Sequence, residues 1–217
     1  ERWGEIHALV NNAGGAGPKC TLRRIPFSEE DCLVSGQSET MLAAAMNLLG
    51  GPWNMTRAAV PHMAREGSVV NVSTIFSRTP YFGRIPYVVP KAGMQRLSIG
   101  LARELGAGEK GIRVNTLFPG PIASERIDTV FAAMDELQGQ PSGTTSETFR
   151  GIMTNRRPTG ADGEMEFSYP TPDDVARTVV FMTSSDSAAI SGHSFEVTNG
   201  MKVPQQSRAK LVSWPAD

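Results

Sequence analysis

The chain has 217 residues, of which 40% are hydrophobic, and its formal net charge is −1. This length supports one sizeable core, and the near-neutral charge excludes the broad basic surface that nucleic acid requires. No apolar run approaches the roughly 20 residues of a membrane span, and no targeting segment is recognisable. The two cysteines, Cys20 and Cys32, and the three scattered histidines make no metal-ligand pattern. We therefore expect a cytoplasmic globular domain with no metal site, no nucleic-acid partner and no membrane partner.

The first half of the chain is predicted to contain two strands separated by one long helix. Residues 6–10 form a short buried strand, and a Gly-rich turn follows at residues 12–17. Residues 38–65 form the helix, which the Gly-Gly-Pro run at 50–52 should loosen or kink. The second strand is expected at residues 68–73.

The second half continues the alternation of strands and helices. Residues 139–170 are rich in Gly, Ser, Thr and Arg and are expected to be a long irregular excursion, as many lids and binding loops are. This excursion ends at Thr171 and Pro172, a strong helix start with Thr as N-cap and Pro at the first helical position. The regular elements are the helices 87–105, 127–137 and 171–184 and the strands 112–118 and 194–198.

Strands that alternate with helices predict an α/β fold, in which a parallel sheet carries helices on both faces. Ligands of such sheets bind at the carboxyl ends of the strands. Asn12 follows the first predicted strand, Thr74 follows the second and Pro119 follows the third. These residues should therefore meet at one edge of the sheet, which is the expected site.

Tyr87 and Lys91 are four residues apart at the start of a predicted helix, so they lie on one face of it. An isolated phenol has a pKa of about 10, too high for proton exchange near neutrality. A fixed cation beside the phenol favours its ionised form, so this pair can exchange a proton with a carbonyl or alcohol oxygen. Ser73 or Thr74, at the end of the preceding strand, can hold that oxygen with a hydroxyl hydrogen bond.

Five motifs, in order along nearly the whole chain, resemble those of the short-chain dehydrogenase/reductase family. They are the Asn-Asn-Ala-Gly turn at 11–14, Asn47 in the long helix, the strand end Asn71-Val-Ser-Thr74, the pair Tyr87-x-x-x-Lys91 and the loop Pro119-Gly-Pro-Ile122. The spacing of 13 residues from Thr74 to Tyr87 is also the family's usual spacing. The resemblance implies a Rossmann-type, doubly wound parallel sheet and an NAD(P)-dependent oxidoreductase.

The resemblance also implies roles for individual residues. The catalytic residues would be Asn47, Thr74, Tyr87 and Lys91, with Tyr87 as the proton donor. The family's usual serine aligns with Thr74, and Ser73 is the alternative hydroxyl. The cofactor would lie against Asn12, Ala13, Gly14, Tyr87, Lys91, Pro119, Gly120 and Ile122, with Ser124 near its phosphates.

A narrower resemblance is to the amino-terminal half of bifunctional malonyl-CoA reductases. It rests on Ser73-Thr-Ile-Phe-Ser-Arg78, Gly83-Arg-Ile-Pro-Tyr87, Phe118-Pro-Gly-Pro-Ile122 and the stretch 129–137. In that family this half reduces malonate semialdehyde to 3-hydroxypropionate with NADPH, so NADPH is the implied cofactor, with NAD(H) left open. The alternatives are a generic short-chain alcohol dehydrogenase or 3-oxoacyl reductase, and a non-catalytic dinucleotide-binding scaffold domain.

The family's Gly-rich phosphate turn, TGxxxGxG, has no counterpart in the sequence. We therefore expect residues 1–217 to form a single partial domain that lacks the N-terminal βαβ portion of the fold and continues into further domains of a longer chain. Residues 124–172 are expected to be a substrate-capping insertion. The helix before Arg65 and the helix after Tyr87 correspond to the family's usual dimer surface, so a homodimer is expected.

Malonate semialdehyde carries a carboxylate, for which a guanidinium is the natural bidentate receptor. Arg84, three residues before Tyr87, is the first candidate for substrate binding, and Arg78 and Arg126 follow it. The alternative for Arg84 is a solvent-facing position on a loop, where most arginines lie.

Overall fold

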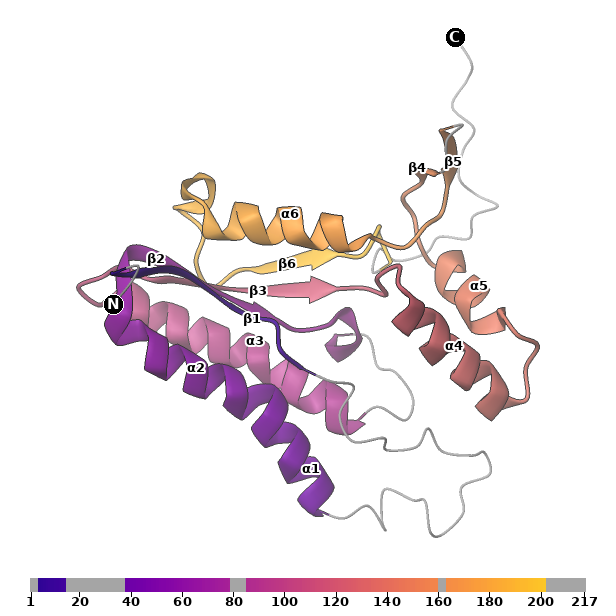
Figure 1. Cartoon of the computed structure of the whole chain (residues 1–217), viewed down its shortest axis with the longest axis horizontal. Helices are drawn as coiled ribbons and strands as arrows, with labels where there is room; N and C mark the ends of the chain where they lie inside the picture. Colours follow the sequence, from indigo (N-terminus) through magenta and orange to yellow (C-terminus); the bar gives the residue numbers. More distant parts are fainter. Residues whose placement is uncertain (1–3, 15–37, 79–84, 160–162, 202–217) are drawn as a thin grey trace.

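The structure, a computed structural model, describes residues 4–14, 38–78, 85–159 and 163–201 (Figure 1). Its centre is a sheet of four strands in the order β1-β2-β3-β6, and each neighbouring pair is parallel. This arrangement confirms the expected α/β fold with a parallel sheet. The strands are β1 (Ile6–Asn11), β2 (Met63–Val72), β3 (Arg113–Pro119) and β6 (Ser194–Val197).

Helices cover both faces of the sheet. Successive residues of a strand point to opposite sides, so the apolar strands present a hydrophobic surface on each face. Val69 and Val114 pack with Leu101 of α3 (Ile85–Gly106) on one face. Val70 and Leu117 pack on the other face with Met182 of α6 (Pro172–Thr183). Figure 1 shows α2 and α3 on one side of the strands and α6 on the opposite side.

The long helix predicted for residues 38–65 is shorter and divided. It comprises α1 (Ser38–Ala45), a π-helix (η2, Met46–Gly50), α2 (Gly51–Ala59) and a 3₁₀ turn (η3, Val60–His62). The expected irregularity near the Gly-Gly-Pro run is confirmed, since Pro52 lacks the N–H that an α-helix would use there.

The helical segment ends at His62, and the prediction that it extends to residue 65 was wrong. Met63 takes an extended backbone and begins β2. The Lys110 ammonium donates hydrogen bonds to the carbonyls of Val60, Pro61 and Met63, at 3.3, 2.8 and 2.7 Å. A cation distant in sequence therefore satisfies the carbonyls at the end of this helix, so the local sequence does not predict where the helix ends.

The segment 139–170 is more regular than predicted. It contains α5 (Thr144–Gly151) and an antiparallel pair, β4 (Arg157–Thr159) with β5 (Glu164–Glu166). The buried Asp135 carboxylate accepts hydrogen bonds from the N–H groups of Gly143 and Thr145, at 2.7 and 2.8 Å. This carboxylate satisfies the first amides of α5 from outside the helix, so the usual cap signal is absent from the sequence.

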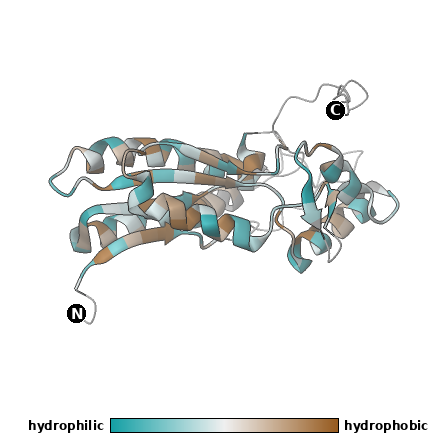
Figure 2. Ribbon diagram, turned by 90° about the horizontal axis from the view of Figure 1, so that it is seen from above, coloured by the Kyte–Doolittle hydropathy of each residue, from teal (hydrophilic) through white to brown (hydrophobic). Residues whose placement is uncertain are grey.

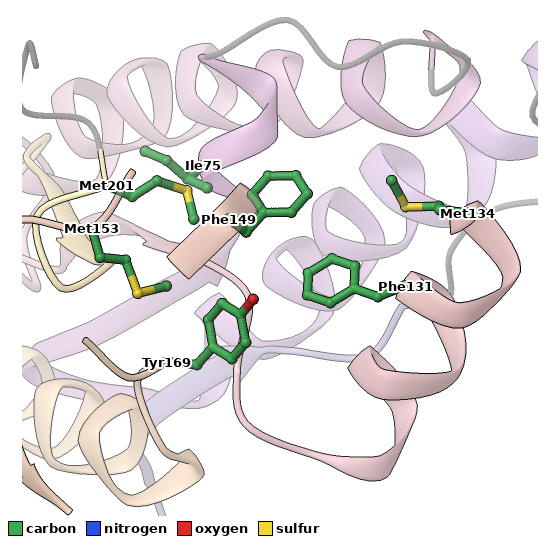
Figure 3. Close-up of a cluster of buried hydrophobic side chains, with 7 residues drawn as sticks. All are labelled: Ile75, Phe131, Met134, Phe149, Met153, Tyr169 and Met201. Carbon is green, nitrogen blue, oxygen red and sulfur yellow. The ribbon is translucent and has the colours of Figure 1, made fainter. Parts of the chain in front are cut away.

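We call α4 (Glu125–Gln138), α5 and the β4–β5 hairpin the distal region, and the sheet with its covering helices the sheet region. Figures 1 and 2 show the distal region beyond the carboxyl ends of β3 and β6. Its core consists of aromatic rings, methionine thioethers and one isoleucine (Figure 3). The members of this core are Ile75, Phe131, Met134, Phe149, Met153, Tyr169 and Met201.

Within the described residues, none of the helices combines the length and the apolar character that crossing a membrane would require.

Candidate functional site

A cavity of about 310 Å³ lies where the sheet region meets the distal region. Loops that follow β1, β2 and β3 form one side of it, as expected for a ligand site of a parallel sheet. The first turns of α3 and one face of α4 form the rest. Its lining residues are Asn12, Gly14, Val72, Ser73, Thr74, Phe76, Tyr87, Lys91, Pro119, Gly120, Pro121, Ile122, Ser124, Arg126, Ile127, Val130, Phe131 and Met134.

Lys91 is held between the end of β2 and α3. Its Nζ donates to the Val72 carbonyl at 2.6 Å, and its own carbonyl accepts from Ser73 Oγ at 2.7 Å. The residue is only 5% exposed, and this burial lowers the pKa of its ammonium to about 8. Lys91 therefore remains mostly protonated at pH 7 and provides a buried cation beside the cavity.

Both candidate hydroxyls, Ser73 and Thr74, line the cavity, but they differ in their hydrogen bonds. Ser73 Oγ donates its proton to the Lys91 carbonyl. Thr74 Oγ1 accepts from the Phe76 N–H at 3.4 Å, and its own proton has no acceptor among the described residues. Because a hydroxyl has a single proton to donate, Thr74 is the one that can donate to a ligand oxygen.

Tyr87 lies in the first turn of α3, half-buried, and lines the cavity together with Lys91. The helix begins at Ile85, close to the predicted start, and contains Pro90. The missing N–H of Pro90 leaves only the Pro86 carbonyl without its helical partner, so the helix continues. Tyr87 and Lys91 thus both face the space in which a ligand would lie.

Two glycines bring backbone close to this site. A Cβ on Gly14 would lie 3.3 Å from Leu48 Cδ2 and 3.7 Å from Lys91 Nζ, so a side chain there would crowd the buried ammonium. A Cβ on Gly120 would lie 3.4 Å from the Thr198 Cα. The N–H of Ile122 has no acceptor among the described residues, and it borders the same cavity. The Ile122 N–H is therefore available to donate a hydrogen bond to a polar ligand atom.

Some predicted site residues lie outside the lining. Asn47 belongs to the π-helix and its side chain is exposed, and Ala13 is exposed. Neither lines the cavity. Gly14, next to Ala13, does line it, and the side chain of Leu48, next to Asn47, lies close to Gly14. Arg84, the first candidate for substrate binding, lies outside the described residues.

The two other arginine candidates have different environments. Arg78 forms an ion pair with Glu196 and stacks over the Phe118 ring at 3.8 Å, and it does not line the cavity. Arg126 lines the cavity, is exposed and has no hydrogen bond or ion pair with any described residue.

The sequence did not indicate the buried polar network beneath the cavity. Asn11 Nδ2 donates to Asn71 Oδ1 at 2.7 Å, and Asn71 Nδ2 donates to Ser98 Oγ at 2.9 Å. Asn11 Nδ2 also lies 3.2 Å from Thr56 Oγ1. The network joins β1 and β2 to α2 and α3, and its members are buried. It fixes the strand ends that carry the cavity.

The part of the chain that the structure describes contains no group of three or more His, Cys, Asp or Glu side chains that could hold a metal ion.

A family model described as enoyl-(acyl carrier protein) reductase matches residues 1–147. Among curated proteins, the 7alpha-hydroxysteroid dehydrogenase of Clostridium sardiniense is 28% identical over 211 residues, covering 95% of this chain and 68% of that protein. The 3-oxoacyl-[acyl-carrier-protein] reductase FabG of Chlamydia muridarum is 29% identical over 201 residues, covering 92% of this chain and 66% of that protein. The chain thus spans about two thirds of these relatives.

Among solved structures, the N-domain of a bacterial malonyl-CoA reductase with NADP is 49% identical to this chain, with a TM-score of 0.77. The match covers 94% of this chain and 38% of the other chain. The similarity to the amino-terminal part of malonyl-CoA reductases, expected from the sequence motifs, is therefore confirmed.

Proposed function

The chain belongs to the short-chain dehydrogenase/reductase family, a family of NAD(P)-dependent oxidoreductases, and on that premise we propose that it reduces an aldehyde to an alcohol with NADPH. The proposed substrate is malonate semialdehyde and the product is 3-hydroxypropionate. The observation that carries the proposal is the cavity shared by Thr74, Tyr87 and Lys91, which are a hydroxyl donor, a proton donor and a cation. The resemblance to malonyl-CoA reductase supports this choice of aldehyde.

The residues around the cavity fit a nicotinamide cofactor. The Lys91 ammonium and the Tyr87 hydroxyl suit the hydroxyl groups of a ribose, and the Ile122 N–H suits a carboxamide oxygen. Asn12, Gly14, Pro119 and Gly120 would contact the cofactor through the loops that end β1 and β3. When bound, the cofactor supplies the hydride that reaches the carbonyl carbon. Ala13 remains a proposed contact through the backbone of its turn.

The chain's own residues would handle the proton and the substrate oxygen. Tyr87 gives its phenolic proton to the carbonyl oxygen as that oxygen becomes an alcohol, and the nearby Lys91 ammonium makes this transfer easier by stabilising the phenolate. Thr74 donates a hydrogen bond to the same oxygen and stabilises the charge that develops on it. Asn47 is proposed to hold a water molecule that links Lys91 to solvent, which its exposed position permits.

We assign substrate capping to residues 124–172. The apolar face of α4 lines the cavity and, with Phe76, packs on the core of the distal region. Such a wall excludes water from the reacting atoms, and a closing lid would do so further.

The assembly and the compartment are also part of the proposal. Leu42 on α1, Met46 on η2, Trp53 on α2 and Val89 on α3 are exposed apolar side chains. Their exposure supports a homodimer formed through these helices, and the proposed location is the cytoplasm. Sedimentation of the full polypeptide with and without Trp53→Lys tests the dimer.

The central experiment compares the natural full-length protein with its Tyr87→Phe variant, following NADPH absorbance with malonate semialdehyde. The variant should lose about 10²–10⁴-fold in kcat, since it keeps the ring and loses the acid. NADPH affinity, measured by fluorescence titration, should change little. Unchanged turnover in the variant would remove Tyr87 as the proton donor.

A generic 3-oxoacyl reductase is the second candidate, because FabG is among the curated relatives. Turnover of 3-oxoacyl thioesters well above that of malonate semialdehyde would favour it. NADPH binding without turnover of any carbonyl substrate would instead favour the scaffold alternative.

A further inference from the structure

One face of α4 forms the wall of the cavity that lies away from the sheet. Arg126, Ile127, Val130, Phe131 and Met134 all line the cavity, and their spacing of three or four residues places them on a single stripe of the helix. Four of these five side chains are apolar. The wall therefore offers a small apolar surface with one guanidinium at the first turn of the helix.

The charge of the cavity is one-sided. Of the described lining residues, Lys91 and Arg126 carry positive charge and none is acidic. Lys91 is almost fully buried, and its ammonium donates to the Val72 carbonyl. Arg126 is exposed and has no ion-pair partner in the described part of the chain, so its five N–H donors remain available.

The contacts of Arg78 argue against it as the anion receptor. Its guanidinium pairs with Glu196 and covers the Phe118 ring, which anchors the turn after Thr74 to β3 and β6. Binding a substrate carboxylate would require Arg78 to leave both contacts. Arg126 has no such contacts to break.

We infer that Arg126 binds the carboxylate of an aldehyde substrate and selects short carbonyl compounds that carry an anionic group. This inference rests on the proposed function. The guanidinium would hold the carboxylate through paired hydrogen bonds, while Thr74 and Tyr87 hold the carbonyl oxygen at the opposite end. Ile127 and Val130 would contact the carbon between these two groups.

The test is a pair of matched variants, Arg126→Gln and Arg177→Gln, assayed in the full-length protein. Arg177 is exposed on α6 and does not line the cavity, so it controls for loss of a surface arginine. Arg126→Gln should lower kcat/KM for malonate semialdehyde by about 10–100-fold, the size expected for a lost charged hydrogen bond. With propanal, a neutral aldehyde of equal length, the change should be less than about threefold. Arg177→Gln should leave both values unchanged.

Two further measurements complete the test. Arg126→Lys should recover part of the loss, because an ammonium keeps the charge and not the bidentate geometry. Calorimetric titration with 3-hydroxypropionate should show weaker binding to Arg126→Gln than to the wild type, and this readout does not depend on turnover.

Several results would overturn the inference. Equal losses with malonate semialdehyde and propanal would show that Arg126 acts on something other than the carboxylate. A weakened NADPH affinity in Arg126→Gln would assign the guanidinium to the cofactor. A selective loss in Arg84→Gln, with none in Arg126→Gln, would assign the carboxylate to Arg84. If the wild type reduced no aldehyde, the proposed function would fail, and the titration with 3-hydroxypropionate would still decide the role of Arg126.

Discussion

The sheet region and the distal region have cores of different chemical character. Beside the strands the core is mainly aliphatic, with Val69, Val70 and Val114 fully buried. The distal core instead stacks Phe131 on Phe149 at 5.1 Å and fills the remaining space with methionines (Figure 3). Branched side chains are stiff and methionines adapt to irregular spaces. The sheet region carries the proposed proton-transfer groups, and α4 of the distal region provides the opposite wall of the cavity.

The two regions are joined by a few specific contacts. The Phe76 ring, next to Thr74, meets the Phe149 ring edge-on at 5.6 Å. Arg157 of β4 forms an ion pair with Asp174 of α6. If the division of roles is correct, variants of the proposed catalytic residues Thr74, Tyr87 and Lys91 in the sheet region should lower the reduction of every aldehyde, whereas variants in the distal region should alter stability and substrate choice.

Besides Tyr87→Phe, the largest effect on activity is expected for Lys91→Met. Loss of the cation that stabilises the phenolate should lower kcat by at least about 10²-fold with all aldehydes. The same change should raise the free energy of unfolding at pH 7 by about 2 kcal/mol, because it removes a buried charge whose pKa is lowered to about 8 and leaves one carbonyl unpaired. Urea unfolding and steady-state kinetics measure the two effects. A destabilised variant would contradict the assignment of Lys91 as a buried cation.

The lowered pKa of Lys91 also predicts a pH dependence. In the unfolded chain Lys91 keeps its proton up to about pH 10.5, whereas in the native protein it loses the proton near pH 8. The unfolded state therefore binds more protons in this interval, so the Lys91 contribution to wild-type stability should rise between pH 8 and pH 10.5. Over the same interval kcat/KM should fall as the cation is lost. Lys91→Met should lack this rise in stability.

A smaller effect on activity, about 10²-fold in kcat, is expected for Thr74→Val, which keeps the shape and removes the hydroxyl. Ser73→Ala is the matched control. It removes the bond to the Lys91 carbonyl and should reduce stability by about 1 kcal/mol, with a much smaller loss of kcat. A larger loss of kcat in Ser73→Ala than in Thr74→Val would assign the hydrogen bond to the substrate oxygen to Ser73.

In the distal region, Phe149→Ala should lower the free energy of unfolding by about 3 kcal/mol, because it removes a ring that stacks on Phe131 and meets Phe76. NADPH affinity should be retained, since the proposed cofactor contacts lie in the sheet region and its loops. Val180→Ala, at a position 66% exposed, is the control and should change stability by less than about 0.5 kcal/mol. A loss of NADPH affinity in Phe149→Ala that accompanies the loss of stability would show that the two regions are not separable.

The smallest effect is expected at the joint between the regions. Hydrogen bonds from the Arg157 guanidinium hold the pKa of Asp174 well below its usual range, and Asp174 also completes the capping box with Thr171. Asp174→Asn should reduce stability at pH 7 by about 1 kcal/mol. Because the native pKa is depressed, this contribution is present above about pH 4 and disappears as the pH falls through the native value. Unfolding curves of the wild type and Asp174→Asn should therefore differ at pH 7 and converge in acid.

Local patterns in the sequence were sufficient for the four strands of the parallel sheet, apart from the start of β2 at Met63, for α3 and for the start of α6. Buried apolar runs gave the strands, and Thr171 with Pro172 marks the start of α6 in the structure as it does in the sequence. Tyr87 and Lys91 could be paired because helical spacing alone puts them on one face. These features depend on interactions between residues close in sequence, which a single chain displays directly.

Only the tertiary structure decided where the long helix ends, why residues 139–170 are ordered, and which hydroxyl can donate. Lys110 caps the carbonyls of Val60, Pro61 and Met63 from about fifty positions away, and Asp135 caps α5 from outside that helix. Ser73 Oγ donates its hydrogen bond to the Lys91 carbonyl, which leaves Thr74 as the cavity-lining hydroxyl whose proton is available. Each of these outcomes depends on a polar group that finds its partner only after the chain has folded, so no local pattern could have revealed it.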